Sequence, residues 1–158
     1  MKKVLIVSIF ILTLTASAKG INKPASEVQS YSAYWSSIDG IILTSPGLID
    51  SFHQFAIHFN DMDSYECAGL TGLYQTHFKG IVDYLNRIKA PAEFEAMHRS
   101  LVNSWSKFLE ATGYLLEYCD TPKMDYIQKT RRAINEANQS LDNAVIEMHE
   151  AKIRLEHK

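Results

Sequence analysis

Hydrophobic residues recur at steps of three and four from residue 28 almost to the end of the chain, the spacing of α-helices with one buried face. In the first segment, residues 27–61, the row consists of Val28, Tyr31, Trp35, Ile38, Ile42, Ser45, Ile49, Phe52, Ala56 and Phe59. Pro46 interrupts this segment because it lacks an N–H donor and disfavours helix at the preceding residue. The apolar spacing nevertheless continues across it. The pattern predicts one long helix that is either kinked near Pro46 or broken there into two helices in line, with Ser45 capping the second.

The second segment, residues 64–89, carries an apolar stripe but also three glycines. The stripe consists of Cys67, Tyr74, Ile81 and Ile88, flanked by Leu70, Phe78 and Leu85. Gly69, Gly72 and Gly80 each cost about 1 kcal/mol of helix propensity relative to alanine. We expect close approach of a neighbouring helix to offset that cost.

The last two segments are the most regular. Residues 92–119 have a broad apolar face, typical of a helix that contacts several neighbours, and residues 123–157 contain neither glycine nor proline. Leucine, isoleucine and methionine recur every seven residues in the last segment, and Ala137, Ala144 and Ala151 lie three residues after members of that row. The alternation predicts an antiparallel contact at short interaxial distance. An intermolecular coiled coil is the alternative, and packing within one chain is favoured.

Four long helices with short connections predict an all-α fold, an antiparallel up-down-up-down four-helix bundle spanning residues 27–158 as one domain. In a hairpin that turns near residue 93, Cys67 and Cys119 lie opposite each other, since each is 26 residues from the turn. Both cysteines also lie on apolar stripes. We therefore expect a Cys67–Cys119 disulfide.

The N-terminus has the layout of a secretory signal peptide. Lys2 and Lys3 precede the apolar run Val4–Thr15, and Ala16-Ser17-Ala18 is a small-x-small cleavage site. Residues 1–18 are thus predicted to be removed after Ala18, which leaves residues 19–26 as a flexible lead-in. The run is too short to span a membrane comfortably, and no later segment qualifies. The predicted location is the periplasm or the exterior of the cell, where a disulfide can form.

The net charge and the absence of known motifs argue against nucleic-acid binding and against several classes of enzyme. Removing Lys2 and Lys3 leaves 14 basic and 18 acidic side chains, a formal charge of −4, and there is no basic stripe for nucleic acid. The sequence lacks CxxCH, CxxC, HExxH and a glycine-rich phosphate loop. We expect a protein that is not an enzyme and has no cofactor.

Two kinds of cofactor occur in four-helix bundles and are possible here, a di-iron centre and a haem. A di-iron site would need two Glu-x-x-His-type pairs, but Asp50-x-x-His53 and Glu95-x-x-His98 are expected on the order of 20 Å apart at 1.5 Å per helical residue. A haem held by Met and His would rest only on likeness of fold. Both remain subordinate alternatives.

One end of the predicted bundle gathers acidic residues. Capping explains some of them, because Asp63 and Glu66 have the spacing of a capping box. Asp61 and Glu117 lie near helix C-termini, where negative charge is unfavourable by about 0.3–1 kcal/mol. His58, Asp61, Glu117 and Asp120 are therefore the candidate site, for a cation or for a basic surface of a partner. The alternative is a solvated acidic end with no role.

These observations favour a protein–protein interaction module, such as an adaptor, inhibitor or immunity-type protein, with an unidentified protein partner. The alternative is a carrier of a small ligand, metal or haem. The sequence leaves the oligomeric state open.

Overall fold

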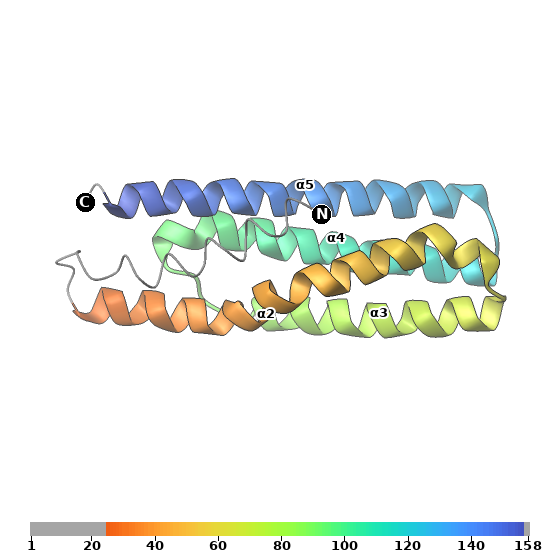
Figure 1. The fold of residues 1–158 in the computed structure, drawn as a ribbon, viewed down its shortest axis with the longest axis horizontal. Helices are drawn as coiled ribbons and strands as arrows, with labels where there is room; N and C mark the ends of the chain where they lie inside the picture. Colours follow the sequence, from red (N-terminus) through yellow and green to blue (C-terminus); the bar gives the residue numbers. More distant parts are fainter. Residues whose placement is uncertain (1–24, 157–158) are drawn as a thin grey trace.

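The computed structural model describes the backbone of residues 25–156 and the side chains of residues 31–156. Within that range the chain is all-helical, with four long α-helices and two short 3₁₀-helices. The long helices, α2 (Ala25–His58), α3 (Ser64–Leu85), α4 (Glu95–Asp120) and α5 (Met124–Glu156), extend along the long axis of the molecule (Figure 1). The predicted signal peptide, its cleavage site and residues 19–24 lie outside the described residues.

Helix α2 continues through Pro46. Ser45 therefore does not cap a second helix, and its hydroxyl donates instead to the carbonyl of Ile41, one turn back. Hydrogen bonding of this kind is common for serine inside helices. The helix ends at His58, and the 3₁₀-helix η2 (Phe59–Asp61) completes the segment that the apolar pattern placed within residues 27–61.

Asp63 caps the start of α3, as the sequence predicted. Its carboxylate accepts a hydrogen bond of 2.8 Å from the backbone N–H of Glu66, which satisfies one of the free donors of the first turn. The expectation for the three glycines of α3 was wrong. A Cβ atom added at Gly69, Gly72 or Gly80 would meet no atom of the described residues within 4 Å, so none of the described helices packs closely against these positions.

A short turn with the 3₁₀-helix η3 (Ala92–Phe94) joins α3 to α4. Contacts between the two helices pair early residues of one with late residues of the other. Cys67 meets Cys119, Phe78 packs on Phe108 with ring centroids 5.6 Å apart, and the carbonyl of Leu85 lies 3.1 Å from Nε2 of His98.

Helices α4 and α5 have the most extensive backbone contact of any helix pair in the described chain. Ala137, Ala144 and Ala151 are all buried, and their small side chains allow the two helices to approach closely. Across the edge of this contact, Lys107 Nζ lies 2.8 Å from Glu110 and 2.9 Å from Glu136. The hydrogen bonds raise the pKa of Lys107 and lower the pKa of both carboxyl groups.

Aromatic side chains fill the centre of the core. Phe52 of α2 packs edge-to-face on Phe78 of α3, with centroids 5.1 Å apart, and Trp105 and Phe108 of α4 complete the cluster. Edge-to-face and tilted pairs of this kind add to the energy of burial. Among residues 25–156, no helix combines the length and apolar character that a membrane span requires.

Candidate functional site

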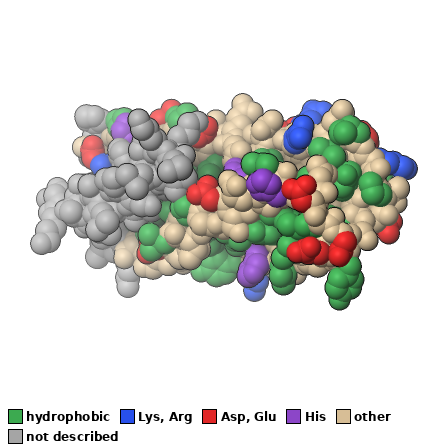
Figure 2. Space-filling model, turned by 45° about the vertical axis from the view of Figure 1, so that its right-hand side comes forward, with side chains coloured by type: hydrophobic (Ala, Val, Ile, Leu, Met, Phe, Trp, Pro, Cys, Tyr) green, Lys and Arg blue, Asp and Glu red, His purple; other side chains and the backbone are tan. Residues whose placement is uncertain are grey.

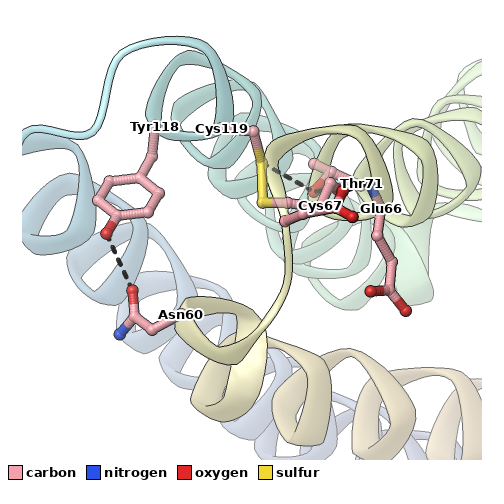
Figure 3. Close-up of a disulfide and its surroundings, with 7 residues drawn as sticks. Asn60, Glu66, Cys67, Thr71, Tyr118 and Cys119 are labelled. Atoms are coloured by element: carbon pink, nitrogen blue, oxygen red, sulfur yellow. Dashed lines mark hydrogen bonds between the residues drawn. A yellow bond between two sulfur atoms is a disulfide. The ribbon is translucent and has the colours of Figure 1, made fainter.

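The candidate site lies at the end of the molecule that holds the α2–α3 and α4–α5 connections, on the right in Figure 1. A disulfide ties this end together. Cys67, in the first turns of α3, is bonded to Cys119, in the last turn of α4, with an S–S distance of 2.04 Å and Cα atoms 5.8 Å apart (Figure 3). The pairing agrees with the predicted hairpin register.

The connection between α2 and α3 is docked on α4 by a second set of contacts. The ring of Phe59 packs edge-to-face on Tyr118, with centroids 5.0 Å apart. The hydroxyl of Tyr118 donates a 3.0 Å hydrogen bond to the side-chain oxygen of Asn60 (Figure 3). Phe59 is buried, so the turn is anchored by an apolar side chain as well as by a hydrogen bond.

The four predicted site residues are all exposed on this end. His58 Nδ1 lies 3.8 Å from a carboxylate oxygen of Asp61, and the side chains are 62% and 84% exposed. Glu117 and Asp120 are exposed on the last turns of α4, and the Thr121 hydroxyl lies 3.2 Å from an Asp120 oxygen. At such exposure solvent screens the His58–Asp61 pair, which contributes little to stability.

A preformed metal centre is not built from these residues. Within residues 25–156, no group of three or more His, Cys, Asp and Glu side chains lies close enough to hold a metal ion. The structure brings His58 to Asp61 but does not assemble them with Glu117 and Asp120 into one coordination shell. Their role in contacting a partner stays a prediction.

Two exposed apolar side chains lie at the same end of the molecule as the acidic residues. Tyr65, at the start of α3, is 90% exposed, and Met124, at the start of α5, is 66% exposed. Met124 was not selected from the sequence, and its place just after the turn that follows Asp120 was the available signal. Acidic and apolar side chains lie next to each other on this part of the surface, with some basic ones nearby (Figure 2).

Tyr114 and Tyr126, also near this end, have partners inside the protein. Tyr114 donates a 2.9 Å hydrogen bond to Glu110, which raises the pKa of its phenol. The ammonium group of Lys129 lies over the rings of Tyr114 and Tyr126, 5.9 Å and 5.6 Å from their centroids. Tyr65 is thus the tyrosine best placed to contact another molecule.

The histidines of the two pairs considered for a di-iron site, His53 and His98, have separate surroundings. His98 lies between Leu85 and Tyr34: its Nε2–H donates to the Leu85 carbonyl at 3.1 Å, and Tyr34 OH lies 3.2 Å from Nδ1. His53 packs on the ring of Phe108 with centroids 6.0 Å apart. Burial lowers the pKa of both imidazoles, opposed in His98 by its hydrogen bond to Leu85 and in His53 by the charge of Asp50.

Comparison with known proteins gives no further guide to this site. No family model matches the chain, and no curated protein or solved structure shows a significant similarity to it.

Proposed function

We propose that this protein is a secreted or periplasmic helical bundle that acts by binding another protein through its disulfide-tied end. We name as the acidic face the exposed residues His58, Asp61, Glu117 and Asp120 with Tyr65 and Met124. The proposal includes an antiparallel up-down-up-down arrangement with a bend in α2 near Pro46. Such an arrangement brings the ends of α2 and α4 and the starts of α3 and α5 to one surface.

The observation that carries the proposal is that two large apolar side chains are exposed at the acidic end of the molecule, which the disulfide ties together. Tyr65 at 90% and Met124 at 66% exposure are large apolar groups in water. Tyrosine and methionine are enriched at the centres of protein interfaces, where charged residues form the rim. The disulfide and the Asn60–Tyr118 hydrogen bond fix the backbone beneath them, which lowers the entropy cost of binding.

Charge indicates the chemistry of the partner. Asp61, Glu117 and Asp120 are exposed acids on this surface, and a partner with a basic patch would approach faster and in a preferred orientation. We therefore infer a partner that presents lysine or arginine side chains around an apolar pocket able to hold Tyr65.

The test is charge reversal with a matched control. The variant D61K/E117K/D120K changes the acidic face, and E95K/E150K/E156K makes the same change in net charge on exposed acids at the opposite end (Figure 1). Partners are captured from the secreted or periplasmic fraction of the source cells, and the dissociation constant is then measured with the purified partner. Circular dichroism and denaturant unfolding establish that both variants are folded.

We expect the acidic-face variant to lose at least about tenfold in affinity while the control binds as the unaltered protein does. Tyr65→Ala should also weaken binding, and higher salt should slow association. Equal binding by both triple variants would remove the acidic face as the site.

A further inference from the structure

A small cavity lies beside Pro46, between α2, α4 and α5, and has no part in the acidic face. Its volume is about 100 Å³. Its lining is mainly aliphatic and includes Ile42 and Ile49 from α2, Met97 and Leu101 from α4, and Ala144 and Met148 from α5. Ser45, Pro46 and Asp142 are also part of the lining. Some of the lining residues are exposed, so the cavity connects with the exterior.

The cavity has a cause in the sequence. Ser45 occupies a core position in the apolar row of α2, where its neighbours in the row are Ile42 and Ile49. Ala144 lines the cavity from α5, in the row of small residues that brings α5 close to α4. Small side chains from two helices therefore leave unfilled volume between them, whereas larger ones would close it.

Polar atoms at this place limit what can bind. Pro46 has no N–H to give to the carbonyl of Ile42, which loses its usual partner in the helix. The Ser45 hydroxyl gives its hydrogen to the Ile41 carbonyl, so its oxygen retains lone pairs that can accept. The Ser45 oxygen is therefore an acceptor on the lining of the cavity, and it suits a ligand with a single hydroxyl donor.

We propose that this cavity binds a small neutral aliphatic alcohol, with its carbon chain against Met97 and Met148 and its hydroxyl donated to Ser45. A dry apolar cavity of about 150 Å³ accepts benzene, so about 100 Å³ holds on the order of four or five heavy atoms. It is smaller than the roughly 300–1,000 Å³ of pockets for drug-sized ligands, which excludes a macrocycle such as haem from this place. This site is separate from the acidic face, and either can fail without the other.

Methionine methyl groups give a direct readout. The protein is labelled with ¹³C-methyl methionine and titrated with 1-butanol, and in a second series it is exposed to xenon. Met97 and Met148 line the cavity, whereas Met62 and Met124 lie at the disulfide-tied end and serve as internal controls. We expect saturable shifts of Met97 and Met148 in both series, without saturable shifts at Met62 and Met124.

Two variants separate the roles of volume and hydroxyl. Ala144→Leu fills the cavity and should abolish both the butanol and the xenon shifts. If that variant loses helicity, Val145→Met, at the partly exposed rim, takes its place. Ser45→Ala should weaken butanol about three- to tenfold, the worth of one hydrogen bond, and leave xenon binding unchanged.

Linear shifts, or equal shifts at all four methionines, would overturn the site. Saturable butanol binding that Ser45→Ala leaves unaltered would overturn the hydroxyl contact and with it the assignment of an alcohol.

Discussion

Removing the Cys67–Cys119 disulfide should cost this protein about 4 kcal/mol of stability. The bond joins residues 52 apart in the sequence. In the chain-entropy model, a closed loop of that length removes about 14 cal/mol/K from the unfolded chain, or about 4 kcal/mol at 25 °C. With an unfolding entropy of about 2.1 cal/mol/K per residue and about 130 ordered residues, the expected fall in Tm is about 14 °C.

The assay is urea unfolding of the oxidised protein, the reduced protein and the double variant C67A/C119A, followed by circular dichroism. The reduced chain is more expanded when unfolded, so its m-value should rise slightly while its midpoint falls. Reductant should leave the double variant unchanged, which controls for effects of the reagent itself. A loss of less than about 1 kcal/mol would refute the reasoning, because it would mean that the unfolded chain is not restrained by the loop.

Three other predictions concern single positions. Burial lowers the pKa of His53 and His98 below the ordinary 6.5, so at mildly acidic pH the unfolded chain binds protons that the folded chain does not. The free energy of unfolding, measured at a series of pH values, should therefore fall as pH drops below about 6.5 and level off below the folded pKa values. The double variant His53→Gln with His98→Gln should flatten this pH dependence. Ser104→Ala should leave stability unchanged or raise it by about 1 kcal/mol, since the buried Ser104 hydroxyl has no hydrogen-bond partner among the described residues. A clear loss in urea unfolding would contradict this. Pro46→Ala should raise stability by about 1–3 kcal/mol, because it returns an N–H to the carbonyl of Ile42 within a continuous helix, and a lower midpoint would show that α2 needs proline here.

The sequence was informative where helix geometry alone decides the outcome. Cys67 and Cys119 could be paired because a helical hairpin with a short turn fixes which residues face each other, and both lie on buried stripes. The cap at Asp63 was predictable because it depends only on residues three apart. Local chemistry and register were therefore sufficient for the helices, the cap and the disulfide.

Features that depend on several helices at once were not predictable. Gly72 has the same neighbours in sequence whether or not another helix approaches it, and none of the described helices does. The cavity beside Pro46 arises from Ser45 and Ala144 on different helices, so neither segment shows it alone. The candidate site shows the same limit: topology brought Asp61 and Glu117 to one end, but the directions of their side chains depend on packing that the sequence does not express.

The placement of the disulfide predicts where the reduced protein opens first. Cys67 and Cys119 join the first turns of α3 to the last turn of α4, beside the turn that Asn60 and Tyr118 hold. Local opening is governed by the contacts of each segment, and the middle of the α4–α5 contact is buried independently of the bond. In hydrogen exchange under native conditions, reduction should accelerate the amides of residues 59–67 more than those of residues 133–148. Equal acceleration of exchange in both segments would instead show that the disulfide acts only by restraining the unfolded chain. The acidic face would then keep its folded structure when the disulfide is reduced.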